Sequence, residues 1–109
     1  MHEQGYAHRD IKLENILMDG DGNPKLIDFG FSTYLRKNKK VRIFCGTPSY
    51  MSPQIIKRVP YSGEAADMWA LGVVLFVLLS GSFPFTGRND KELYSRIKNR
   101  SFHYPRCIR

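Results

Sequence analysis

The 109-residue sequence lacks the features that mark several classes of protein. Its two cysteines, Cys45 and Cys107, form neither a zinc-ligand spacing nor a dense disulfide framework, so both are expected to be reduced thiols. The longest apolar stretch, Trp69 to Leu79, is shorter than the about 20 residues that span a bilayer, and no signal peptide opens the chain. Zinc-finger spacings and aromatic RNA-binding strand motifs are also missing. These absences predict a cytoplasmic protein with no membrane and no nucleic-acid partner.

Acidic residues are missing from a long internal stretch. No Asp or Glu lies between Asp28 and Glu64, whereas seven Lys and Arg do, five of them in residues 36–42. Most such basic runs are solvated loops, and the alternatives are a nuclear-import patch or a docking surface for phosphate. Nuclear localisation therefore stays open beside a cytoplasmic one.

What the chain does contain is typical of one small globular domain. Hydrophobic residues make up 42% and charged residues 25% of the sequence, which predicts a packed core. Residues 64–80 are apolar nearly all round and precede Gly81, which predicts a fully buried central helix. Asn89 with Glu92 resembles a capping box and predicts a shorter surface helix after it.

Two short apolar segments surround the turn sequence DGDGNP. Residues 16–18 and 25–27 are predicted to form a small hairpin with Ile16 opposite Ile27. Residues 28–53 show little periodicity and are predicted to form one long loop. Loops of that length inside compact domains are usually functional.

The hairpin would bring Asn15 and Asp28 next to each other. Because cross-strand neighbours stand about 5 Å apart, the two side chains can share Mg²⁺, which prefers oxygen ligands and keeps several positions for phosphate and water. Asp10 would project beside the metal as a carboxylate able to accept a hydroxyl proton, and Lys12 adds a cation for transferred charge. A lone loop Asp is usually a turn former or a cap, so the assignment depends on the whole set. Together the four residues suit phosphoryl transfer to an alcohol.

The sequences HRDIKLEN at 8–15 and DFG at 28–30 resemble the catalytic and metal-binding loops of eukaryotic protein kinases. GTPSYMSPQ resembles the substrate-binding loop that ends in Ala-Pro-Glu, and DMWALGVVLF resembles the central helix of the large lobe. KLIDFGFST, FCGTPSYM and SGSFPF are most similar to the calcium/calmodulin-dependent and AMP-activated kinase branch. The resemblance implies an α+β protein-kinase-like fold, here a mostly helical large-lobe fragment with a small β-hairpin.

This resemblance implies ATP and Mg²⁺ as cofactors. Asp10 would be the catalytic base, with Lys12 on the transferred phosphate, and Asn15 and Asp28 would be the magnesium ligands. Lys12 together with Thr47 of the GTP sequence resembles the serine/threonine class. Thr47 is therefore placed with both the catalytic and the substrate-binding residues, and Ser and Thr of protein substrates would accept the phosphate.

Further positions are implied for the nucleotide and the substrate. Leu17 would form the floor under the adenine, with Ile27 beside it. Glu14 would border both the cofactor and the substrate, because it matches the family position whose carboxylate meets an Arg two residues before the acceptor. Substrates with basic residues near the acceptor are therefore expected.

Four residues are expected to support the site structurally: Arg9, Phe29, Gly30 and Asp67. Asp67 would hydrogen-bond the backbone of the catalytic loop, and Phe29 would stack with His8 in the spine that links both lobes. In related kinases the arginine at the position of Arg9 helps to hold a phosphorylated residue of the activation loop.

The customary acceptor of that phosphate lies two residues before Cys45, and this chain has Ile43 there. Phosphorylation at the customary position is therefore not expected to switch this protein.

The 1–109 chain is predicted to be a partial kinase domain that holds the catalytic loop, the metal-binding loop, the activation segment, the central helix and the following helix. The small lobe, with its Gly-rich loop, and the late helices are expected to be absent from it, and Gln54 replaces the Glu of Ala-Pro-Glu. As given, the chain should have little activity alone. The alternative is a non-catalytic kinase-like scaffold or binding protein.

Overall fold

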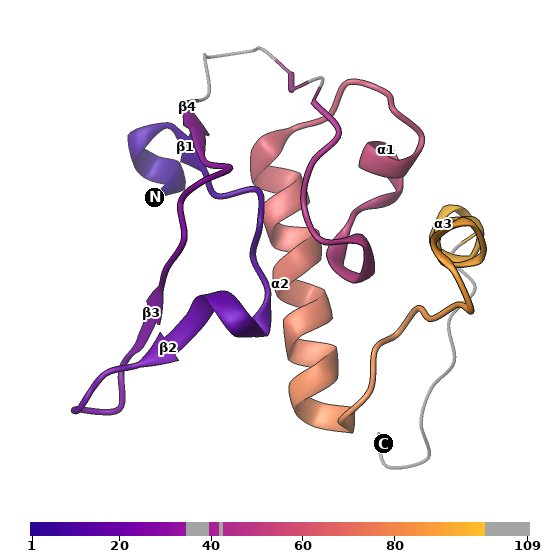
Figure 1. The fold of residues 1–109 in the computed structure, drawn as a ribbon. Coiled ribbons are helices and arrows are strands. Elements are labelled where there is room, and N and C mark those ends of the chain that lie inside the picture. The colour runs from indigo at the N-terminus through magenta and orange to yellow at the C-terminus, as the bar shows by residue number, and fades with distance from the viewer. Residues whose placement is uncertain (35–39, 42, 100–109) are drawn as a thin grey trace.

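Helix α2 (Gly63–Ser80) is the axis of the fold in the computed structural model, which describes residues 1–34, 40–41 and 43–99 (Figure 1). The helix begins at Ser62, whose hydroxyl accepts a hydrogen bond from the Ala65 amide, and ends at Gly81, which has a left-handed φ of 79°. The other elements are η1 (His2–Gln4), β1 (Tyr6–Ala7), η2 (Leu13–Asn15), β2 (Ile16–Met18), β3 (Pro24–Leu26), β4 (Thr33–Tyr34), η3 (Pro48–Tyr50), α1 (Pro53–Ile56) and α3 (Asp90–Lys98).

Strands β2 and β3 form the predicted antiparallel hairpin, but with a different register. Ile16 lies opposite Leu26, so the predicted pairing of Ile16 with Ile27 is wrong by one residue. The turn explains the shift, because Asp19 donates its amide to the Asn23 carbonyl and accepts the Asn23 amide on its carboxylate. This closes the loop one residue earlier than a six-residue turn would.

The predicted single loop over 28–53 is wrong in part. Strand β4 lies within it and pairs with β1, with Tyr6 opposite Tyr34 and their ring centroids 5.4 Å apart. Helix η3 lies within it as well. Elements of two or three residues are too short to give a periodic pattern, so composition alone assigned them to a loop.

Two of the sequence predictions concern residues that the structure describes only partly. Most of the basic run at 36–42 lies outside the described residues, as does Cys107. Cys45 is buried and is a free thiol, as expected.

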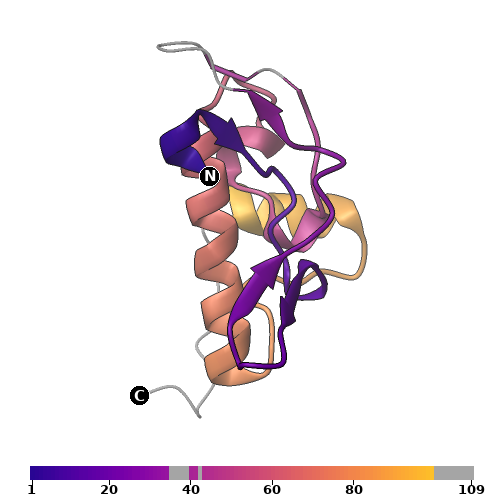
Figure 2. The same cartoon turned by 90° about the vertical axis from the view of Figure 1, so that its left-hand side faces the viewer.

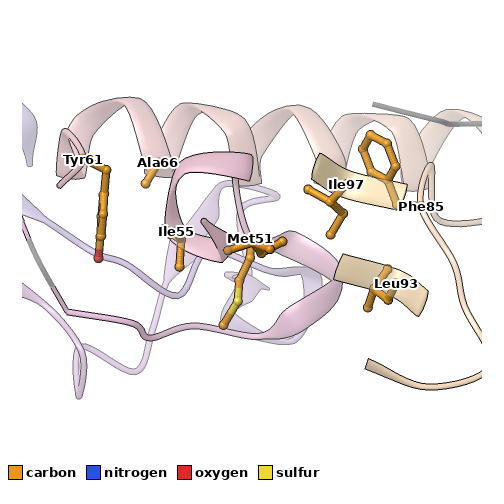
Figure 3. Packing of buried hydrophobic residues seen from close by; sticks show 8 residues of the cluster. Met51, Ile55, Tyr61, Ala66, Phe85, Leu93 and Ile97 are labelled. Carbon is orange, nitrogen blue, oxygen red and sulfur yellow. The ribbon is translucent and has the colours of Figure 1, made fainter. Parts of the chain in front are cut away.

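The main hydrophobic core lies between α1, the first half of α2, and α3 (Figure 3). α3 contributes Leu93 and Ile97, and Ile97 is completely buried. The predicted N-terminal cap of α3 is confirmed, because the Asn89 side chain accepts a hydrogen bond from the Glu92 amide. The buried members of this core are Met51, Ile55, Ile56, Tyr61, Ala66, Phe85, Leu93 and Ile97.

A second apolar cluster connects α2 to the segment that follows η1. It comprises Ile11, Tyr50, Ala70, Val73 and Val74, so η3 and the residues around 11 pack on the same side of α2 as the main core. Figure 2 shows α2 at one edge of the molecule with most other elements gathered beside it.

The prediction that α2 is fully buried is wrong for this chain. Among its larger side chains Leu75, Leu78 and Leu79 are more than half exposed, whereas Val73 on the opposite side is buried. By length and composition alone the helix could cross a membrane, with a mean hydropathy of 1.6 and one third of its residues buried. The core helix of a water-soluble domain passes the same test, and here the buried side packs against the rest of the chain.

Substitutions on the two sides of the core should differ sharply in cost. Ile97→Ala should lower the free energy of unfolding by about 2–5 kcal/mol, because it leaves a cavity in the main core. Leu78→Ala should change it by less than about 0.5 kcal/mol, because that side chain is 66% exposed. Urea unfolding followed by circular dichroism measures both. Equal losses would show that the outer side of α2 is covered in solution.

Candidate active site

The site depends on a carboxylate set into the apolar helix α2. Asp67 is 2% exposed and accepts hydrogen bonds from the backbone amides of His8 and Arg9, each at 2.8 Å. The predicted contact between Asp67 and the catalytic-loop backbone is thus confirmed. His2 Nε2 contacts the same carboxylate at 2.8 Å, a partner that no sequence pattern indicated.

These bonds hold the loop in an unusual conformation. Arg9 has a φ of 68°, in the left-handed region that non-glycine residues rarely adopt, at a cost of about 1 kcal/mol or more. The Asp67 carboxylate bonds the amide of that very residue. Fixing this bend sets the direction in which the side chain of the next residue, Asp10, points out of the loop.

His8 has the structural role that was expected of it. Its ring is completely buried, and Nδ1 accepts the amide of Asp10 at 3.1 Å, so the proton lies on Nε2, which donates to the Ile27 carbonyl at 2.9 Å. The ring contacts Phe29 as predicted, with centroids 5.1 Å apart, but the two rings meet edge-on and are not stacked. His8 therefore connects the loop at 8–15 to the residues before and within the DFG sequence.

The expected catalytic residues meet in one hydrogen-bonded group. The hydroxyl of Thr47 donates to Asp10 Oδ1 at 2.9 Å, and Lys12 Nζ donates to that same hydroxyl at 3.1 Å. Lys12 Nζ also lies 3.8 Å from Asp10 Oδ2. The Asn15 side-chain amide donates to the Asp10 carbonyl at 2.9 Å. Residues 37 positions apart in the sequence are thereby assembled around one carboxylate.

The hairpin brings Asn15 and Asp28 near each other, although not as the predicted cross-strand pair. The Ile27 amide donates to the Asn15 carbonyl at 2.9 Å, so Asp28 is the next residue after the one that pairs with Asn15. Asp28 is exposed and has a φ of 59°, and its Oδ1 accepts the Gly30 amide at 3.2 Å. A side chain at Gly30 would place its Cβ 3.2 Å from the same oxygen, so glycine leaves the carboxylate room.

These two residues fit the coordination chemistry of Mg²⁺. Because Asn15 uses its Nδ2 to donate to Asp10, its side-chain oxygen faces no competing donor within the described part of the chain. The second carboxylate oxygen of Asp28 is likewise without a hydrogen bond there. Two oxygen ligands leave most positions of an octahedral ion for phosphate and water. No group of three or more His, Cys, Asp or Glu forms an alternative metal site among residues 1–34, 40–41 and 43–99.

The residues expected to contact the adenine and the substrate lie on the surface. Leu17 and Ile27 are 52% and 37% exposed, and Glu14 is exposed as well. Their surroundings leave them accessible to a ligand, and their roles stay predictions.

The comparisons with known proteins agree with the geometry. A family model described as protein kinase domain matches residues 1–107. The chain belongs to the protein kinase family. The predicted resemblance and the predicted partial kinase-like fold are confirmed.

Several curated kinases are similar to this chain. NUAK family SNF1-like kinase 2 of Rattus norvegicus is 45% identical over 104 residues, which cover 95% of this chain and 16% of the relative. CBL-interacting protein kinase 4 of Oryza sativa subsp. japonica is 42% identical over 110 residues, which cover 98% of this chain and 24% of the relative. The chain thus spans about a sixth to a quarter of the length of these relatives.

Removing the charge of Asp67 should destabilise the whole fold, because this carboxylate joins α2 to the loop at 8–15. Asp67→Asn should lower the free energy of unfolding by about 3 kcal/mol, because an amide cannot accept from all the donors that now face the carboxylate. Glu64→Gln, on the exposed side of the same helix, is the matched control and should cost less than about 0.5 kcal/mol. Urea unfolding of both variants gives the comparison, and equal values would remove Asp67 as the anchor.

Proposed function

We propose that this chain supplies the catalytic part of a serine/threonine protein kinase, which transfers the γ-phosphate of ATP to Ser or Thr of protein substrates. The observation that carries the proposal is the group formed by Asp10, Lys12, Asn15 and Thr47. Family membership supports the same reaction. Three of the four side chains are ordered around a single carboxylate that is 7% exposed.

Asp10 is the group that would receive the proton of the substrate hydroxyl. Its Oδ1 is engaged by the Thr47 hydroxyl at 2.9 Å, and the Asn15 Nδ2 approaches its Oδ2 at 3.4 Å. These contacts fix the plane of the Asp10 carboxylate. A substrate hydroxyl bonded to this carboxylate would then be oriented before the phosphoryl group is transferred. Positioning of this kind provides most of the catalysis in phosphoryl transfer, where the transition state is loose.

Lys12 supplies positive charge at the same place. Its ammonium lies 3.8 Å from the Asp10 carboxylate and donates to the Thr47 hydroxyl, so it is held where the transferred phosphoryl group would pass. A fixed cation stabilises the charge on the phosphoryl oxygens without needing to reorganise. Thr47, between the two, connects the substrate-binding segment to the catalytic loop.

Asn15 and Asp28 would hold the metal, and Leu17 with Ile27 would contact the adenine. Mg²⁺ held by Asn15 and Asp28 would supply positive charge against the phosphates of ATP. Glu14 is the proposed contact for a basic residue of the substrate, because its exposed carboxylate lies in the same loop as Asp10. A cytoplasmic location stays a prediction.

The roles of the two aspartates can be separated in a chimeric kinase domain, in which residues 1–107 replace the matching segment of the rat relative. Asp10→Asn should lower kcat at least about 100-fold with little change in ATP affinity, because the base is lost while the metal ligands stay. Asp28→Ala should instead abolish Mg²⁺-dependent nucleotide binding. Steady-state kinetics and calorimetry provide the two readouts.

Asp21→Asn, in the exposed hairpin turn, is the matched control and should behave as the parent. Full activity of the Asp10 variant would remove the assignment of Asp10 as base. A parent chimera that binds nucleotide but transfers no phosphate would favour the scaffold hypothesis.

Substrate preference can be tested on the same chimera. Peptides with Arg two residues before the acceptor should be phosphorylated with a kcat/KM about 5-fold higher than peptides with Ala there, which corresponds to an exposed ion pair of up to about 1 kcal/mol. Glu14→Gln should remove this difference without changing the rate on the Ala peptide. An undiminished preference in the Gln variant would exclude Glu14 as the contact.

A further inference from the structure

Tyr61 makes three hydrogen bonds to the segment that precedes Thr47. Its backbone pairs with Val41 in both directions, at 2.7 and 2.9 Å, and its hydroxyl donates to the Ile43 carbonyl at 2.7 Å. The hydroxyl also lies 3.8 Å from Cys45 Sγ. Tyr61 is 4% exposed, and Figure 3 shows its ring at one end of the main core with the hydroxyl directed away from α2. Tyr61 thus contacts Val41, Ile43 and Cys45.

The surroundings of the hydroxyl keep it a hydrogen-bond donor. Burial raises the pKa of Tyr61 to about 12, and the neighbouring Cys45 adds to this effect, while the Arg9 guanidinium acts in the opposite direction. At physiological pH the phenol is therefore protonated, and its bond to the Ile43 carbonyl involves no ionised group. Such a bond is barely screened by salt.

A second set of contacts holds Phe44 of the same segment. The Arg58 guanidinium lies over the Phe44 ring, 4.1 Å from its centroid, and Tyr94 of α3 meets that ring edge-on at 6.1 Å. Both contacts are with an aromatic ring, and neither requires an anion.

No hydroxyl exists at the position where related kinases carry the activating phosphate. Ile43 occupies it, and its side chain is 57% exposed while its carbonyl is bound by Tyr61. Arg9, the expected phosphate ligand, donates its Nε to the Phe31 carbonyl at 2.6 Å. Arg9 Nη1 is buried without a hydrogen-bond partner among the described residues, so the Arg9 guanidinium is only partly satisfied by backbone, while the Ile43 carbonyl is engaged by Tyr61.

We infer that Tyr61 is a positioning residue that docks the activation segment in place of a phosphate, so that Thr47 reaches Asp10 without phosphorylation at position 43. The inference rests on the proposed kinase function for its catalytic consequence only. Only Gly46 separates Cys45 from Thr47, and it has a φ of 113°, with the position of a Cβ only 3.3 Å from the Arg9 carbonyl. Because the segment passes this close to the catalytic loop, a displacement at 43–45 is transmitted directly to Thr47.

Hydrogen exchange of the 109-residue chain tests the docking without any need for activity. Tyr61→Phe should speed exchange in peptides covering 41–51 roughly fivefold, because it removes one hydrogen bond and leaves the Ile43 carbonyl without its donor. Tyr6→Phe, at a half-exposed tyrosine of β1, is the matched control and should leave these peptides unchanged. Peptides from the second half of α2 report global unfolding. Unchanged exchange at 41–51 in the Tyr61 variant would overturn the inference.

Kinetics of the chimeric kinase domain test the catalytic consequence. Tyr61→Phe should raise the KM for the peptide substrate roughly fivefold and leave the KM for ATP unchanged, whereas a merely structural role would lower the amount of active enzyme and change neither KM. Phosphatase treatment of the parent chimera should not change its activity. Loss of activity on that treatment would overturn the inference even if exchange behaved as expected. An inactive parent chimera would contradict the proposed function, while the exchange result would still decide whether Tyr61 docks the segment.

Discussion

A carboxylate buried in an apolar helix is stable only when donors surround it, and Asp67 finds its donors in the catalytic loop. This requirement constrains much of the structure. Because the amides of His8 and Arg9 point at α2, the loop bends at Arg9. The side chain of Asp10 is thereby directed toward Thr47. The hydrogen bonds that stabilise the buried charge are therefore the same ones that position Asp10, the proposed base. A helix made only of apolar side chains could pack equally well but would leave the loop without a fixed direction.

The parts of the site that could be predicted from the sequence are those encoded by short local spacings. Asn15 lies near Asp28 because a hairpin returns the chain, and that holds whether the register is the predicted one or the observed one, shifted by a residue. The register depends on the hydrogen bond from the Asn23 amide to the Asp19 carboxylate, which closes the turn. A side-chain contact of this kind cannot be predicted from composition. The contacts of His2 and Tyr61 could not be predicted, because they join segments far apart in the sequence and neither residue belongs to a periodic pattern.

The uncovered side of α2 shows a different limit of sequence reasoning. Apolar residues on every side of a helix predict burial on every side, and Leu75 and Leu78 are as apolar as Val73 and Val74. Among the described residues α1, α3, η3 and the catalytic loop all pack against one side only. An apolar residue type shows that a position in α2 tolerates burial. Because α2 is apolar on every side, its sequence has no periodic pattern that separates covered from uncovered positions. The first and last residues of α2 were therefore predicted better than the burial of its two sides.

Docking a segment by a buried phenol has physical consequences that differ from docking it by a phosphate. A phosphate held by arginine contributes strong attraction that salt weakens and that an enzyme can add or remove. The bond from the Tyr61 hydroxyl to the Ile43 carbonyl joins uncharged groups, and Tyr61 is 4% exposed, so the bond is formed whenever the core around Tyr61 is folded. The order of the activation segment is then coupled to the stability of the cluster that contains Met51, Ile55 and Tyr61. A segment coupled in this way is released by local unfolding of the core, and its control passes from a modifying enzyme to whatever contacts change the stability of that cluster.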